Sequence, residues 1–466
     1  MTPREIDPFL MIPERSTALS KKEANLAQRW QLEVDRLIAR DHFDRRAMLD
    51  WQFETLRRIV DNAVRYIPFY RRKYGAEGFC VGDLTSWNDY DQLPVLTKDE
   101  LIEASEEVRD LFVSQGGVRH ESRTSGSSGR ILTLFQDEAT NNQHLLYYRR
   151  FFETVAGPRD GSFGPDLYQI YLCPERTTSI GDGFTVRTVS LDAGETEVLE
   201  DIRTCRPRIL WGFASYFLRL RRTFGNGLRE LGIQAVITNS EASSRLERRL
   251  LSEAFGCPVY DEYSSEELYL IATERLCEQY HLVEDSVRVD VIDPDESGVG
   301  RLCGTSLVDA GFPMIRYEQG DVGRITEFSE QRGCECGSHA RILDRFQGRA
   351  DQHLVLTGGG VLEGDRLMLL YDENLLPARA GLRAFRIIQE QAGSATLVAV
   401  AESSKAVSAW EKFRSDIERM TEGRLMMQVE WVDQLPHIPG TKRRLVFSSV
   451  PETMQSPLPG VQQVEG

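Results

Sequence analysis

One short stretch of the chain has the composition of a phosphate-binding loop. Residues 121–135 read ESRTSGSSGRILTLF, which places Thr124, Ser125, Gly126, Ser127, Ser128, Gly129 and Arg130 side by side. Glycines let the backbone approach phosphate oxygens, hydroxyls and backbone amides donate hydrogen bonds to them, and an arginine adds positive charge. The P-loop pattern GxxxxGK[ST] is missing, so an ordinary polar turn is the alternative. Because the stretch leads into the strand-like ILTLF, we expect a turn between two strands rather than a linker.

Four further residues have types and spacings that suit a metal. Most of the eight cysteines are scattered, as is usual for reduced thiols in a large chain. Cys277 and His281 form a C-x3-H pair, and Cys334 and Cys336 form a C-x-C pair. Together they would supply four ligands to a tetrahedral Zn²⁺. The spacing is irregular, and a plain turn of reduced cysteines is the competing interpretation.

Composition limits the classes of protein to which the chain can belong. Its 466 residues favour two or more domains, and 41% hydrophobic with 27% charged residues is typical of a globular protein. A net charge of −16 argues against a nucleic-acid surface. No apolar run is long enough to predict a membrane-spanning helix, and the first residues lack the pattern of a secretory signal. We therefore expect a cytoplasmic protein without nucleic-acid or membrane partners.

Hydrophobic periodicity predicts an α/β fold with mixed sheets and helices. A helical lead-in is expected over about 20–74, ending its main helix before Pro68, and Thr97 with Glu100 predicts a capped helix start. Strands are expected at 167–172, 235–238, 258–263 and 286–293, with helices at 214–224 and 243–255 between them. We predict a large N-terminal domain (1–348), a small, mobile α+β C-terminal domain (349–451) and a disordered tail (452–466).

Several segments, in order, resemble adenylate-forming enzymes. TSGSSGR resembles their phosphate loop, ITNSEASS (237–244) their adenine-side turn, and YDEYSSEELYLIATE (260–274) their Y-G-x-[ST]-E element. RYEQGDVGRI (316–325), GRADQHLVLTGG (348–359) and PHIPGTKRRLV (436–446) resemble the RYRTGD element, the hinge and the segment with a catalytic lysine. Within this superfamily, residues from about 45 to 450 are most similar to the phenylacetate–CoA ligases and the related capsular polysaccharide biosynthesis proteins.

The resemblance implies roles for single residues around ATP. Glu267 would bind the Mg²⁺ of ATP; the alternative is a solvated acidic turn, as expected for Glu262 and Glu266. Asp321 would accept hydrogen bonds from both ribose hydroxyls. The remaining nucleotide contacts would come from Tyr263 and the turn at Ser240 and Glu241 on the adenine side, and from Arg349 near ribose or phosphate.

Three further segments complete the predicted site. Lys442 would bridge the acyl carboxylate and the α-phosphate, although a charged surface loop around "GTKRR" is the alternative, and Asp351 would be the hinge of the small domain. The segment with Trp211, Gly212 and Phe213 would line the substrate pocket. Arg130 replaces the usual lysine of the phosphate loop, and Ser264 replaces a glycine.

The sequence therefore predicts a ligase that uses ATP and Mg²⁺ to convert a carboxylic acid, aromatic by analogy, into an acyl-adenylate with release of pyrophosphate. Coenzyme A is the expected acceptor, and an amine or amino acid is the alternative. A non-catalytic nucleotide-binding or scaffold protein is the rival from another class. Its support comes from Arg130, Ser264 and the loss of the family's aromatic–proline pair at Leu362 and Glu363. A homodimer is one option for its assembly.

Overall fold

The computed structural model describes residues 21–114, 120–123, 132–157, 163–180, 183–308, 311–328, 333–349, 353–375, 385–400, 403–433, 435 and 445–450. Four predicted features lie outside these residues: the phosphate loop from Thr124 to Arg130, the hinge Asp351, the catalytic Lys442 and the tail at 452–466. In the described part of the chain, no helix is long and apolar enough to cross a membrane.

The chain begins with the helical lead-in that its periodicity predicts. The helix α2 ends at Tyr66, and Pro68 starts α3 at a position where its missing N–H costs nothing. Thr97 accepts from the backbone of Glu100, and Glu100 caps in return, so the predicted capping box starts α5. The helices of this lead-in are α1 (Lys21–Arg40), α2 (Arg45–Tyr66), α3 (Pro68–Ala76), α4 (Trp87–Gln92), α5 (Lys98–Glu103) and α6 (Ser105–Ser114).

A short hairpin and a long helix follow. β1 (His120–Arg123) pairs antiparallel with β2 (Thr133–Gln136), with Arg123 opposite Thr133. The predicted phosphate loop therefore connects two paired strands, as expected from the sequence. Asp137 caps the next helix, α7 (Glu138–Ala156), by accepting from the backbone N–H of Thr140.

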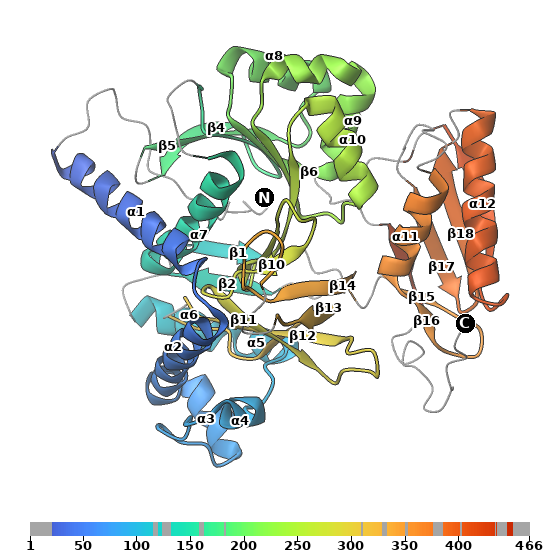
Figure 1. Cartoon of the computed structure of the whole chain (residues 1–466). Coiled ribbons are helices and arrows are strands. Elements are labelled where there is room, and N and C mark those ends of the chain that lie inside the picture. The colour runs from blue at the N-terminus through green and yellow to red at the C-terminus, as the bar shows by residue number, and fades with distance from the viewer. Residues whose placement is uncertain are drawn as a thin grey trace.

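A sheet of twelve strands dominates the fold, in the order β11-β12-β13-β14-β10-β9-β8-β7-β6-β3-β5-β4 (Figure 1). Its parallel part comprises β3 (Leu167–Tyr171), β5 (Phe184–Ser190), β6 (Ile209–Phe213), β7 (Ala235–Asn239) and β8 (Val259–Ser265), with β4 (Arg176–Ile180) as an antiparallel edge. One face packs on α7, and the other packs on α8 (Glu195–Cys205), α9 (Ala214–Phe224), η1 (Gly225–Leu231) and α10 (Arg245–Phe255). Because both faces are covered, these strands are buried almost throughout.

The other half of the sheet is antiparallel and packs against the helices of the lead-in. It consists of β9 (Tyr269–Glu274), β10 (Tyr280–Leu282), β11 (Val287–Ile292), β12 (Gly300–Ser306), β13 (Tyr317–Thr326) and β14 (Ile342–Arg349). A buried ion-pair network joins the two layers. The Glu284 carboxylate accepts from Arg45 of α2 at 2.7 Å and from Arg341 at 2.7 Å. Burial opposes ionisation here, but the two guanidinium groups nevertheless lower the pKa of Glu284.

The C-terminal elements have a core of their own. A four-stranded sheet with the order β19-β18-β17-β20 packs with α11, α12 and the β15–β16 hairpin around Trp410 and Phe413 (Figure 1). The elements are β15 (Leu354–Val355), β16 (Val361–Leu362), α11 (Gly364–Leu375), β17 (Arg386–Gln391), β18 (Ser394–Val400), α12 (Ser404–Met420), β19 (Met426–Val432) and β20 (Val446–Ser448). The α/β fold class is confirmed, whereas the domain limits at 348 and 451 stay predictions.

Candidate active site

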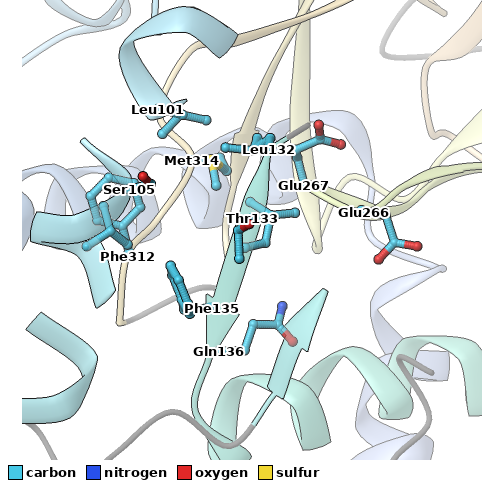
Figure 2. A pocket seen from close by; sticks show the side chains of 12 residues that line it. Leu101, Ser105, Leu132, Thr133, Phe135, Gln136, Glu266, Glu267, Phe312 and Met314 are labelled. Carbon is cyan, nitrogen blue, oxygen red and sulfur yellow. The ribbon is translucent and has the colours of Figure 1, made fainter. Parts of the chain in front are cut away.

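A pocket lies where the predicted phosphate loop rejoins the described chain. It encloses about 400 Å³ of empty space, part of it open to solvent. Its walls come from α5 and α6 on one side, from β2 in the middle, and from the turn with Glu266 and Glu267 (Figure 2). β2, which follows the predicted phosphate loop in the sequence, contributes residues 133–136 to this pocket. Glu267 is partly buried and accepts a hydrogen bond from the Tyr317 hydroxyl at 3.1 Å.

Two residues that the sequence assigns to the nucleotide meet in the structure. The hydroxyl of Tyr263, in β8, donates to Oδ2 of Asp321, in β13, at 2.6 Å. The ring of Tyr263 also lies 4.4 Å from that of Phe346. Asp321 pairs with Arg349 across the β13–β14 ladder, so the backbone of Arg349 lies beside Asp321. Residues from three distant segments therefore converge on one side of Tyr263.

The predicted adenine-side turn follows β7 directly. Ser240 has a φ of +61°, a left-handed conformation that turns the chain sharply at the end of the strand. Glu241 is buried and accepts a hydrogen bond from the backbone N–H of Ser215 at the start of α9, 3.1 Å away. This contact uses the carboxylate of Glu241 to fix the start of a helix, where a negative charge is stabilising.

The three residues of the predicted substrate segment have different surroundings. The ring of Trp211 stacks on that of Tyr171, with 6.1 Å between the ring centroids, and its centroid lies 5.9 Å from that of Tyr148. Trp211 is on the face of the sheet that α7 covers. Phe213 instead packs in the core beneath α8, α9 and α10. A Cβ on Gly212 would come within 2.8 Å of the Ile170 carbonyl oxygen, so close strand packing already requires this glycine.

Glu262 corrects the expectation of a solvated acidic turn. It lies within β8 and is only 5% exposed, because β7 and β9 flank this strand. Ser264 donates to its Oε1 at 3.2 Å, whereas its buried Oε2 has no hydrogen-bond partner among the described residues. Burial, followed by the charge of Asp261, raises the pKa of Glu262 to about 8. The signal available in the sequence was an acidic residue inside a predicted central strand. Glu266 is partly exposed, closer to the expectation.

The cysteine and histidine pairs form one cluster. The possible ligand atoms of Cys277, His281, Cys334 and Cys336 all lie within 4.8 Å of one another. Nε2 of His281 is 3.3 Å from Sγ of Cys277 and 3.5 Å from Sγ of Cys336. The β10 strand brings His281 to this place, because it pairs with both β9 and β14. A tight turn closed by the Gly337 N–H donating to the Cys334 carbonyl holds the other pair.

Comparisons with known proteins bear on this site. No family model matches the chain. A solved 2-hydroxyisobutyryl-CoA ligase, in complex with an acyl-AMP, is 20% identical and superposes with a TM-score of 0.67 over 96% of this chain and 95% of that one. The chain therefore shares its fold with that ligase.

Sequence relatives narrow the class. The phenylacetate-coenzyme A ligase of Thermus thermophilus is 25% identical over 336 residues, which is 66% of this chain and 72% of the relative. The corresponding enzyme of Escherichia coli is 22% identical over 329 residues, 66% of this chain and 73% of the relative. The chain is thus a homologue of phenylacetate–CoA ligases, and the resemblance noted in its sequence is confirmed.

Proposed function

We propose that the protein is an ATP-dependent carboxylate–CoA ligase. In the first step a carboxylate oxygen bonds to the α-phosphorus of ATP, and the bond to the departing pyrophosphate breaks. In the second step the sulfur of coenzyme A attacks the acyl carbon, the thiol proton is released, and AMP leaves with the bonding electrons. Coenzyme A is preferred over an amine because the two relatives compared in sequence and the superposed structure are CoA ligases.

One observation carries this proposal. Tyr263, Asp321 and the backbone of Arg349 come from three strands, and the chain brings them together although they are separated by 58 and 28 positions. We propose that adenosine binds here, with its ribose hydroxyls donating to Asp321. The Tyr263 hydroxyl already supports one carboxylate oxygen, which orients the group for this task.

The triphosphate would extend from there to the pocket beside Glu267. Carboxylate oxygens are suitable ligands for Mg²⁺, and Glu267 lies partly open on the pocket wall. Glu267 would hold this metal, which would supply positive charge to offset that of the phosphates. The hydroxyls and amides of the loop from Thr124 to Arg130 would surround the phosphates. We further propose Lys442 as the cation between carboxylate and α-phosphate, delivered by a C-terminal domain that turns about Asp351.

Exchange of labelled pyrophosphate into ATP tests this function without knowledge of the acceptor. A panel of aryl and acyl acids should contain at least one that stimulates exchange. Glu267→Gln should reduce the rate by about 100-fold, because one charged metal ligand is lost. Glu230→Gln, which changes an exposed carboxylate of η1, is the matched control and should leave it unchanged. Folded protein that exchanges with no acid in a broad panel would favour a non-catalytic nucleotide-binding protein.

We also propose that the cluster of Cys277, His281, Cys334 and Cys336 binds one structural zinc ion. Zinc–ligand distances of about 2.0–2.3 Å place tetrahedral ligands about 3.5 Å apart, close to the 3.3 and 3.5 Å separations around His281. Metal analysis of the purified protein should give about one zinc per chain. Cys334→Ser should lower both the zinc content and the melting temperature, whereas Cys80→Ser, at an exposed cysteine, should change neither. A metal-free preparation that is as stable as the zinc-loaded protein would exclude the site.

A further inference from the structure

A buried carboxylate faces aromatic rings at one end of the parallel sheet. β3, β6, β7 and β8 are neighbours that run in the same direction, so their carboxyl ends meet at one edge. Thr238 of β7 pairs with Asp261 of β8, and the next residues along are Asn239 and Glu262. Ligands of α/β proteins commonly bind at such an edge.

Three aromatic side chains surround this point. Trp211 contacts both Tyr148 and Tyr171, and Trp211 is among the side chains that lower the pKa of Glu262. Burial raises the pKa of Tyr148, and the charge of Glu262 is the next largest cause. The pKa of Tyr171 is raised by burial, by Glu266 and by Glu262. The carboxylate and the rings therefore belong to one local environment.

Asp261, the residue before Glu262 in β8, has hydrogen-bond partners that Glu262 lacks. Asp261 accepts from the hydroxyls of Thr238 and Tyr280; burial raises its pKa, and the charge of Arg248 opposes that shift. Glu262 has the Ser264 hydroxyl on Oε1, but its buried Oε2 lacks a hydrogen-bond partner in the described part of the chain. Burial has the largest influence on the pKa of Glu262; the side chains that follow it are Asp261, Ser264, Trp211 and Asn239, and none of these is a cation.

An ammonium group would satisfy this environment. It donates hydrogen bonds to a carboxylate, compensates its buried charge, and is attracted to the faces of tyrosine and tryptophan rings. Glu262 stands five positions before Glu267 on the same strand and turn, a span of at most about 17 Å in extended chain. Glu266, which lines the pocket beside Glu267, is also among the charges that raise the pKa of Tyr148 and of Tyr171, so one end of the pocket lies near these rings.

We propose that the acid activated by this protein carries an amino group, and that Glu262, with Tyr148, Tyr171 and Trp211 around it, recognises this group as an ammonium ion. The inference rests on the proposed ligase function and adds the class of its substrate. The protonated amine has no free electron pair, so it does not attack the acyl-adenylate in its own site. Glu262 determines specificity and takes no part in the bond changes.

The proposed ammonium site also predicts that substrate binding changes the protonation of Glu262. Without a ligand Glu262 holds a proton near neutral pH, since its pKa is about 8. The titratable groups that interact with its charge are Asp261, Tyr148 and Tyr171, and Glu266 acts on the same two tyrosines. An ammonium ion beside it stabilises the carboxylate form. Binding of an amino acid at pH 7 should therefore release about one proton, whereas binding of the corresponding acid without nitrogen should release none.

The test compares acids that differ only in the amino group. Suitable pairs are phenylalanine with 3-phenylpropanoate, β-phenylalanine with the same acid, and 4-(aminomethyl)benzoate with 4-methylbenzoate. In pyrophosphate exchange, at least one amino member should exceed its partner by about 10- to 100-fold in kcat/KM. Glu262→Gln should remove that preference while keeping exchange with the unsubstituted acid, and Glu262→Asp should retain part of it. Calorimetry in two buffers of different ionisation enthalpy, with an α,β-methylene ATP analogue present, measures the proton release.

The outcomes separate this inference from the proposed function. Exchange that is equal for both members of every pair, or that is unchanged in its preference by Glu262→Gln, overturns the ammonium site and leaves the ligase function standing. A preference for hydroxyl analogues over amino analogues also overturns it. Absence of exchange with every acid refutes the ligase function and this inference together. Glu230→Gln serves as the control and should keep the preference of the parent protein.

Discussion

Replacing Glu262 by glutamine should stabilise the folded protein, and the gain should increase with pH. A glutamate carboxyl group ordinarily has a pKa of 4.5, which for Glu262 burial first and the charge of Asp261 second raise to about 8 in the folded state. The folded protein therefore binds this proton more tightly than the unfolded chain does. A group of this kind has its full stabilising effect below pH 4.5 and loses it as the pH rises towards 8. Glutamine has the shape of the protonated side chain and does not titrate.

The expected size follows from the displacement of the pKa. Each pH unit between the two pKa values costs the folded state about 1.4 kcal/mol. Between pH 5 and pH 7 the advantage of Glu262→Gln over the parent should therefore grow by about 2 to 3 kcal/mol. The value of about 2 to 3 kcal/mol is an upper range, because the protein around a buried charge relaxes in part and lowers its cost.

Urea-induced unfolding, followed by tryptophan fluorescence at pH 5, 6, 7 and 8, measures this difference. Glu230→Gln is the control, because Glu230 is exposed on η1 and its replacement should give a difference that does not change with pH. A Glu262→Gln variant that is less stable than the parent at pH 7 would contradict the reasoning. It would mean that the carboxylate is ionised and has partners in the folded protein. A constant difference from pH 5 to pH 8 would contradict it as well.

Three further outcomes are expected. Asp321→Asn should weaken ATP binding by about tenfold, measured by calorimetry, because a neutral amide accepts less strongly from ribose hydroxyls, while Tyr263→Phe should have a smaller effect of the same sign. Lys442→Ala should abolish the ATP-dependent reaction yet spare thioester formation from supplied acyl-adenylate. Asp351→Pro should instead spare adenylation and slow thioester formation. Equal losses of both half-reactions in both variants would argue against domain rotation. Glu284→Gln should destabilise the protein by about 3–5 kcal/mol in chemical unfolding, since Arg45 and Arg341 would lose their buried counter-charge, and a loss below about 1 kcal/mol would show that water reaches this network.

Local signals in the sequence were reliable where the structure depends on a few adjacent residues. The break at Pro68 and the capping box at Thr97 are satisfied within three or four positions, so no distant contact was needed to predict them. The strands β3, β7 and β8 were likewise predicted from short segments of the sequence. The order of the motifs indicated the similarity to phenylacetate–CoA ligases that the sequence relatives confirm. The roles of Asp321, Glu267 and Lys442 came from that resemblance and remain predictions.

Tertiary structure alone decided which distant residues meet. The hydrogen bond from Tyr263 to Asp321 and the approach of His281 to Cys336 depend on the order of the strands, which local propensity does not encode. Glu262 shows this most clearly. A glutamate between an aspartate and a tyrosine is typical of a solvent-exposed turn by its own chemistry. It is buried here because β7 and β9 flank its strand, while helices and aromatic side chains cover the sheet. Burial depends on what packs around a residue, so the chemistry of this glutamate did not indicate that it would be buried, although its strand was predicted.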